Sequence, residues 1–241
     1  MALRAIIFDV DGTLAETEEA HRTAFNRAFA EAGKPWSWSQ DDYRALLTTT
    51  GGKERIARYL DELGMAPDPA LVAALHARKN ALYADLVAEG AVLARPGVRR
   101  LIEDASRQDI ALAIATTTSA TNLATLLDHV IGRGAAGWFA AIVTGEMVAV
   151  KKPDPEAYEL ALVDLGLPAS ACVAIEDSRN GLEAARGAGI ATLVTPSHYT
   201  HHEDFKGAAL VRRDLDDGVT LDTVRDLVVV SRGMAVSRMS S

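Results

Sequence analysis

The sequence predicts an α/β fold in which a doubly wound, Rossmann-like parallel sheet carries a small inserted helical domain. Short apolar runs recur along the 241-residue chain, and helical patterns separate most of them. Strands that alternate with helices form βαβ units, whose parallel sheet is covered on both faces. The stretch between the first two runs reads as helices alone, and it exceeds the one helix that a crossover needs. We therefore expect the excess to form a domain of its own.

Six strands are expected at the apolar runs. The first, Ala5 to Asp9, is uninterrupted and is followed by the turn residues Gly12 and Thr13, which predicts a strand buried on both faces. The other strands are expected over residues 110–115, 140–143, 172–175, 191–194 and, more weakly, 208–211.

Four helices are expected in the insertion because each has an apolar stripe and a signal for its start or its end. These signals are Gly33, the capping-box pair Ser39 and Asp42, Gly64, and the pair Asp68 and Pro69. We predict a discontinuous α/β core over residues 1–15 and 91–241 and a helical cap over residues 16–90. Hinges are expected near Ala15-Glu16 and Gly90-Pro96.

The composition bears on partners and location. The formal net charge is −8, which disfavours nucleic acid and anionic membranes as partners. No run approaches the roughly 18 apolar residues of a membrane span, and no secretory signal is visible. The single cysteine, Cys172, cannot form an intrachain disulfide and is expected to be buried in a strand. We expect a cytoplasmic protein that is a monomer or a weak oligomer.

Asp9 and Asp11 stand at the end of the first predicted strand. Residues i and i+2 of a strand point the same way, so both carboxylates are expected to project from its carboxyl end, where open α/β sheets bind ligands. Paired carboxylates repel each other without a cation, and Mg²⁺ prefers oxygen ligands. A carboxylate can attack phosphorus while a neighbouring acid protonates the leaving oxygen and then activates water. A turn with a purely structural role is the alternative.

The segment from Asp9 to Thr13, DVDGT, resembles the first signature of the haloacid dehalogenase superfamily, D-x-D-x-T/V. Three further segments resemble the remaining signatures in order. They are Thr116 after the second strand, Lys152 before a proline, and the pair Glu176 and Asp177 after the strand CVAI. Lys151 is expected to be a solvated surface charge.

The resemblance implies a phosphatase in which Asp9 is the nucleophile and Asp11 the acid/base. It implies that Thr116 bonds the transferring phosphoryl group and that Lys152 offsets its charge. It also implies Mg²⁺ held by the Asp9 carboxylate, the Asp11 carbonyl and Asp177, with Glu176 close by or ligating through water. The insertion is similar to the helical caps of β-phosphoglucomutase and phosphoglycolate phosphatase.

A narrower resemblance rests on the segments Thr49–Arg55 and Ala115–Ser119, which look like those of CbbY-type sugar-phosphate phosphatases of Calvin-cycle organisms. That group hydrolyses xylulose 1,5-bisphosphate, so a small phosphorylated sugar is the expected partner. Two glycines ahead of two cations indicate a loop that approaches a ligand closely. The candidate substrate-binding residues are Glu18, His21, Tyr43, Gly51, Gly52, Lys53, Arg55, Thr117 and Thr118.

Other interpretations stay open at this point. A phosphomutase would use the same Asp9 and Asp11, and only net release of phosphate separates it from a phosphatase. A receiver-type signalling domain lacks the second aspartate and the helical insertion. A dinucleotide-binding module would need a G-x-G-x-x-G after the first strand, which the chain lacks. The histidines at 198, 201 and 202 are expected in a surface loop and not at a metal, and the tail after Val230 is expected to be frayed.

Overall fold

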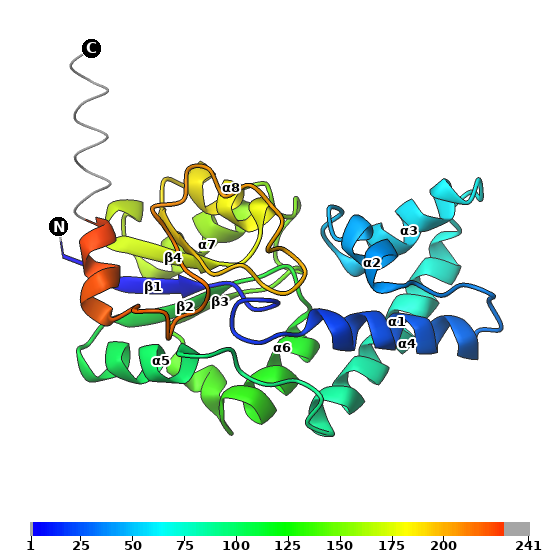
Figure 1. The fold of residues 1–241 in the computed structure, drawn as a ribbon, viewed down its shortest axis with the longest axis horizontal. Helices are drawn as coiled ribbons and strands as arrows, with labels where there is room; N and C mark the ends of the chain where they lie inside the picture. The colour runs from blue at the N-terminus through cyan, green and yellow to red at the C-terminus, as the bar shows by residue number, and fades with distance from the viewer. Residues whose placement is uncertain (1, 229–241) are drawn as a thin grey trace, which may run out of the picture.

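The computed structural model describes residues 2–228. A six-stranded sheet lies at its centre in the order β3-β2-β1-β4-β5-β6, and every neighbouring pair is parallel (Figure 1). The predicted α/β fold is confirmed, and only the weakest expected strand is much shorter than predicted. The strands are β1 (Ala5–Phe8), β2 (Ala111–Ala115), β3 (Ala141–Val143), β4 (Cys172–Glu176), β5 (Ala191–Val194) and β6 (Leu210–Val211).

Helices cover both faces of the sheet because successive strand residues point to opposite faces. Ile6 and Phe8 pack into one apolar cluster with α5 and α6, whereas Ala5 and Ile7 pack into another with α7 and α8. Cys172 is buried in the second cluster, as predicted. The elements of the core are α5 (Val98–Arg107), α6 (Ala120–Leu126), η1 (Leu127–Ile131), η2 (Ala135–Trp138), α7 (Glu156–Leu165), η3 (Ala169–Ala171) and α8 (Arg179–Gly187).

Of the five helices between β1 and β2, the first four lie to one side of the sheet, and we call them the cap (Figure 1). The predicted helix starts are present: Ser39 and Asp42 form a capping box, and the Asp68 side chain accepts from the Ala70 amide. Phe25 and Trp38 belong to an aromatic cluster inside the cap. The exact division at residues 16 and 90 stays a prediction. The helices are α1 (Glu18–Glu31), α2 (Gln40–Leu46), α3 (Gly52–Glu62) and α4 (Pro69–Ala88).

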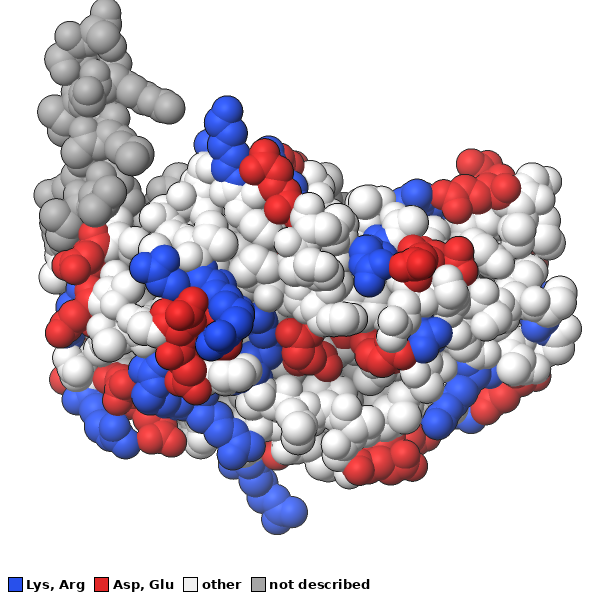
Figure 2. Space-filling view, in the orientation of Figure 1, with Lys and Arg blue, Asp and Glu red and all other residues white. Residues whose placement is uncertain are grey.

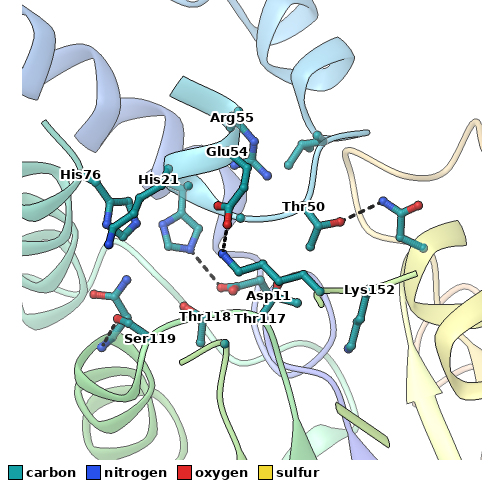
Figure 3. Close-up of a pocket in the computed structure, with 18 of the residues that line it drawn as sticks. Asp11, His21, Thr50, Glu54, Arg55, His76, Thr117, Thr118, Ser119 and Lys152 are labelled. Atoms are coloured by element: carbon teal, nitrogen blue, oxygen red, sulfur yellow. Dashed lines mark hydrogen bonds and ion pairs between the residues drawn. The ribbon is translucent and has the colours of Figure 1, made fainter. Parts of the chain in front are cut away.

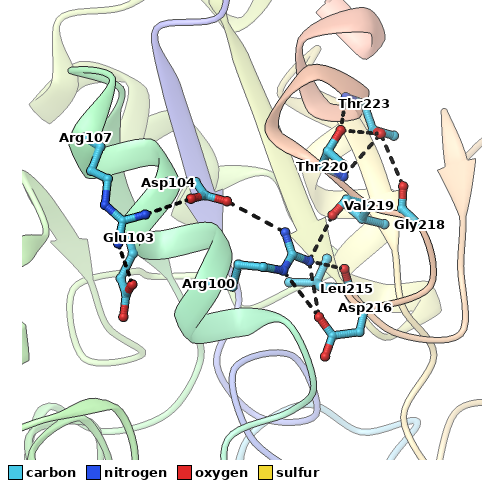
Figure 4. Close-up of polar contacts among 10 residues, drawn as sticks. All are labelled: Arg100, Glu103, Asp104, Arg107, Leu215, Asp216, Gly218, Val219, Thr220 and Thr223. Atoms are coloured by element: carbon cyan, nitrogen blue, oxygen red, sulfur yellow. Dashed lines mark hydrogen bonds and ion pairs between the residues drawn. The ribbon is translucent and has the colours of Figure 1, made fainter.

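The last described segment is held against α5 by Arg100 (Figure 4). Its guanidinium donates to the carbonyls of Leu215 at 2.6 Å and Val219 at 2.9 Å. Thr220 and Thr223 then exchange amide-to-hydroxyl bonds at the start of a helix over residues 221–228. The tail after Val230 lies outside the described residues.

Acidic and basic side chains are interspersed on the face in Figure 2.

His198, His201 and His202 are exposed in the loop after β5, as expected. Within residues 2–228, no helix combines the length and the apolar character needed to cross a membrane.

Candidate active site

A pocket of about 890 Å³ lies where the carboxyl ends of the strands face the cap, and residues from both line it (Figure 3). Asp9 and Asp11 enter it directly after β1. The Asp9 amide still donates to the Ile175 carbonyl at 3.0 Å, so the sheet itself fixes the first carboxylate. The chain then turns at Gly12, whose φ of +81° lies in the left-handed region that glycine adopts readily.

Lys152 joins the acidic residues at the base of the pocket. Its Nζ lies 2.7 Å from Asp9 Oδ1 and 2.6 Å from Glu176 Oε1, and it also donates to the Ala115 carbonyl at 2.8 Å. Tyr158 donates to the same Glu176 oxygen at 2.6 Å. Burial disfavours the ammonium, but Asp9 and Glu176 outweigh it and raise the pKa of Lys152. Lys152 therefore stays charged beside Asp9.

Three buried carboxylates form the group best suited to a cation. One oxygen from each of Asp9, Glu176 and Asp177 lies within 4.8 Å of the others. Burial raises the pKa of Asp9 to about 8, with Glu176 adding to the rise and Lys152 opposing it. Burial, Asp9 and Glu176 likewise raise the pKa of Asp177 well above its ordinary value. One lysine does not neutralise three carboxylates, and an oxygen-ligated divalent cation fits this excess of negative charge.

Glycines make room for two of these carboxylates. A Cβ added at Gly12 would lie 2.3 Å from Asp177 Oδ2, and one added at Gly181 would lie 2.0 Å from the Glu176 carboxyl carbon. Both distances are far inside van der Waals contact. The glycine that follows Asp11 is therefore required by the position of Asp177 as well as by the turn.

Asp11 is held by contacts with the start of the cap. Thr17 donates to Asp11 Oδ1 at 2.7 Å, and His21 Nε2 lies 3.0 Å from the same oxygen. Lys79 Nζ lies 2.7 Å from His21 Nδ1. Because the Asp11 carboxylate can only accept, the His21 proton lies on Nε2 and points to Asp11, which leaves Nδ1 to accept from Lys79. Burial alone would raise the pKa of Asp11, but His21, Thr17 and Lys79 together lower it to about 2.

Three threonines follow β2. Thr116 is buried, and its hydroxyl accepts from the Thr118 amide at 3.2 Å. Thr117 and Thr118 line the pocket, as expected of substrate-binding candidates. Gly145 allows this loop to pack closely, because a Cβ there would lie 2.2 Å from the Thr117 carbonyl oxygen.

The cap side of the pocket holds a connected polar group. Glu18 and Arg55 line the pocket, but Tyr43 does not. The Tyr43 hydroxyl donates to Glu18 Oε2 at 2.7 Å and accepts from Arg55 Nη1 at 2.9 Å. Its ring packs in the aromatic cluster of the cap. Tyr43 is therefore turned into the cap, where it holds two residues that do face the cleft, and its direct contact with a substrate stays a prediction.

The loop at Gly51 and Gly52 lies against the core, and Lys53 projects from it with an exposed side chain. Lys151 Nζ forms a 2.6 Å ion pair with Glu54 Oε1, and Asn180 donates to the Thr50 hydroxyl at 3.2 Å. Lys151 is therefore not the solvated surface charge that was expected. It lines the pocket and joins the core to the cap.

Sequence reasoning missed Lys79, His76 and Arg95. Lys79 lies on the apolar stripe of α4 with Leu75 and Leu82, where a charge is unusual, and this was a readable signal. His76 lines the pocket beside Gly52. Arg95 is buried at the second predicted hinge, and no local sequence pattern predicted its contacts. It donates to the carbonyls of Gly12, Thr195, Pro196 and Arg213 and pairs with Glu16.

Comparison with known proteins agrees with this geometry. The family of haloacid dehalogenase-like hydrolases matches residues 3–189. The chain is 52% identical over 206 residues to the protein CbbY of Cereibacter sphaeroides. The aligned region covers 86% of this chain and 90% of that relative. The chain is a haloacid dehalogenase-like hydrolase of the CbbY family. The hydrolase is also 49% identical over 220 residues to the protein CbbY of Rhodobacter capsulatus, covering 91% of this chain and 97% of that relative.

Solved structures extend the likeness to the whole fold of the hydrolase. CbbY from Rhodobacter sphaeroides in complex with phosphate superposes with a TM-score of 0.89 at 48% identity, covering 92% of this chain and 99% of that one. A mutant of that protein in complex with xylulose 1,5-bisphosphate gives the same values. The predicted family and its CbbY branch are confirmed, so neither a receiver domain nor a dinucleotide-binding module describes this hydrolase. The four signature segments all lie within the matched residues.

Proposed function

We propose that the hydrolase is a Mg²⁺-dependent phosphatase that releases phosphate from a pentulose bisphosphate, with xylulose 1,5-bisphosphate as the best candidate substrate. The observation that carries the proposal is the placement of Asp9, with Lys152 at 2.7 Å, beside Asp11 at the end of the same strand. Phosphoryl transfer through an aspartyl-phosphate needs a carboxylate nucleophile and a second acid nearby, and a neighbouring cation stabilises the charge. The complex of the CbbY relative with xylulose 1,5-bisphosphate supports the substrate.

In the first step, an Asp9 oxygen attacks phosphorus, the bond from phosphorus to the sugar oxygen breaks, and Asp11 gives that oxygen its proton. In the second step, a water oxygen attacks phosphorus, Asp11 takes the proton of that water, and the bond from phosphorus to the Asp9 oxygen breaks, so that inorganic phosphate leaves and the Asp9 carboxylate is restored. The low pKa of Asp11 suits the second step. For the first step, the negative charge of a bound phosphoryl group opposes that shift and favours the protonated acid.

Asp9, Asp177 and the Asp11 carbonyl are the proposed ligands of Mg²⁺. Bound there, the cation would neutralise the phosphoryl oxygens and orient them toward Asp9. Glu176 is engaged by Lys152 and Tyr158, which favours a supporting place beside the ligands. Lys152 and Thr116 would contribute a positive charge and a hydroxyl to the same phosphoryl group.

The cap supplies cations that the reacting phosphate does not need. Arg55 is buried, lines the pocket and has an Nε without a hydrogen-bond partner within the described residues. Lys53 is exposed near the start of the same helix, α3. An arginine fork and a lysine suit the oxygens of a second, distal phosphate. Glu18 would bond hydroxyls between the two ends. His21, whose two ring nitrogens are engaged by Asp11 and Lys79, would line the same part of the pocket. Thr117, Thr118, Gly51 and Gly52 would contact the substrate from the surrounding loops.

The test is phosphate release from a panel of sugar monophosphates and bisphosphates, with and without Mg²⁺. We expect activity to stop with EDTA and to return with Mg²⁺, and kcat/KM to be highest for a pentulose bisphosphate. Arg55→Ala should lower kcat/KM for the bisphosphate far more than for a monophosphate, because only the bisphosphate has a distal group to lose. Tyr43→Phe should do so to a smaller degree, since it releases Arg55 without removing it.

Arg58→Ala is the matched control. Arg58 is an arginine of the same helix, but it bonds Glu62 and Thr48 and does not line the pocket. Arg58→Ala should leave kcat/KM unchanged for both substrates. An equal loss of kcat/KM on both substrates in Arg55→Ala would mean that Arg55 supports the cap and does not bind a distal phosphate. Conversion of a sugar phosphate without net phosphate release would show a phosphomutase instead.

A further inference from the structure

The loop after β5 places a hydroxyl against the back of the acidic cluster. Thr200 Oγ1 lies 2.7 Å from the Asp177 carbonyl oxygen and 3.1 Å from Asp177 Oδ2, so one proton serves two acceptors of the same residue. The hydroxyl itself accepts from the Ser197 amide at 2.9 Å and lies 3.0 Å from the Ser197 hydroxyl, which can donate to it while Thr200 donates to Asp177. Thr200 is buried with Asp177, and it lies beyond the residues that the family match covers.

Asp177 is thus confined from two sides. Gly12 leaves no room for even a methyl group on one side, and Thr200 fixes the other. Arg95 links the turn at Gly12 to the loop after β5, because it donates to the carbonyl of Gly12 and to those of Thr195 and Pro196. The carboxylate can therefore shift only if the loop after β5 shifts with it.

The same loop is anchored to the cap by the residue that precedes Thr200. The Tyr199 hydroxyl donates to Glu19 Oε2 on α1 at 2.5 Å. Its ring meets that of Tyr43 edge-on, with centroids 5.6 Å apart, and the Arg44 guanidinium lies over it. Tyr199 is buried in the aromatic cluster of the cap, although it belongs to a core loop. A movement of the cap would pull on the turn that holds Asp177.

We propose that Thr200 is a positioning residue for the cation ligand Asp177, and that Tyr199 couples this turn to the cap. The inference rests on the proposed cation site. Groups that orient a metal ligand contribute to metal affinity without touching the metal, and their loss typically weakens binding roughly 10–100-fold. Cap and cation would then be linked through one turn outside the signature segments.

The experiment measures Mg²⁺ binding to the full chain by isothermal titration calorimetry, without substrate, so that turnover plays no part. Thr200→Val keeps the shape and removes the hydroxyl, and we expect its Kd for Mg²⁺ to rise about tenfold. Thr200→Ser restores the hydroxyl and should bind within about threefold of wild type. Thr192→Val is the matched control, because that buried threonine bonds only the Ile190 carbonyl, away from the pocket. Circular dichroism checks that each variant is folded, and Thr200→Ala serves if Thr200→Val is not.

The coupling to the cap is tested in the same way. Tyr199→Phe removes the hydroxyl that bonds Glu19 and keeps the ring, and it should raise the Kd for Mg²⁺ about threefold. Glu62→Gln breaks an ion pair with Arg58 that lies wholly inside the cap, away from the pocket, and should not change it. Wild-type Mg²⁺ affinity in Asp177→Ala would overturn the cation site and this inference with it. Wild-type affinity in the Thr200 variants that lack the hydroxyl would overturn the positioning role alone. Equal effects of Tyr199→Phe and Glu62→Gln would overturn the coupling.

Discussion

Glu54 of the cap and Lys151 of the core form a 2.6 Å ion pair beside the Gly51 loop, and both line the active-site pocket. The pair is partly exposed, so solvent screens it, and such pairs contribute about 0.2–1 kcal/mol. Its importance lies in its place, because opening the cap must break it.

Glu54→Gln should therefore loosen the cap without unfolding the protein. We expect faster amide hydrogen exchange in residues 50–62 and a fall in Tm of less than about 3 °C. Glu62→Gln is the control, because it breaks a pair of similar exposure that lies wholly inside the cap, with Arg58. Exchange rates that rise equally in both variants would show that the contact with the core is not what holds this loop.

Asp9→Asn should abolish phosphate release because an amide is not a nucleophile toward phosphorus. The fold should survive, since the substitution removes one of three mutually repelling carboxylates and leaves Lys152 paired with Glu176. We expect a Tm without Mg²⁺ that is at least that of wild type. Phosphate release above about one-tenth of the wild-type rate would contradict the role of Asp9.

Asp11→Asn should lower kcat by a factor of roughly 10²–10⁴, the usual contribution of a general acid and base. If activation of water suffers most, aspartyl-phosphate should accumulate on Asp9 and appear in the mass of the acid-quenched protein. The amide can still contact Thr17 and His21, so the turn should be kept. An unchanged kcat would leave Asp11 with a turn-forming role only.

Lys79 predicts how stability depends on pH. Burial lowers its pKa to about 7, although Asp11 opposes the shift. An unfolded lysine keeps its proton to about pH 10.4. Between these values the unfolded chain binds more protons, so the free energy of unfolding rises with pH, by up to about 1.4 kcal/mol per unit from this group.

Lys79→Met should remove that contribution. Urea unfolding at pH 7.5 and pH 9.5 should show wild type gaining stability relative to the variant at the higher pH. The variant should also be the more stable of the two near pH 7, where the buried ammonium is most costly. A difference between wild type and variant that does not change with pH would mean that Lys79 keeps an ordinary pKa.

The sequence predicted the parts of the site that depend on local geometry. Asp9 and Asp11 follow a buried run, and a strand necessarily turns residues i and i+2 the same way. The ion pair of Glu54 with Lys151 could not be predicted from the sequence, because no local pattern relates a cap helix to a loop far along the chain. Tyr43 was ambiguous, since one helix face serves either a core or a cleft. Lys79 was readable in principle, as a charge on an apolar stripe has to find a buried partner.

The central place of β1 in the sheet has a kinetic consequence. Ala5 pairs with Ala111 on one side and with Cys172 on the other, so the strand that leads to the proposed nucleophile Asp9 closes two long loops. The cap helices lie within residues 18–88, so their contacts are closer in sequence than the pairings of β1, and pairing between distant strands is slow. As the chain leaves the ribosome, the cap can fold while β1 still lacks β4. Substrate recognition would thus take shape before the catalytic strand is in place.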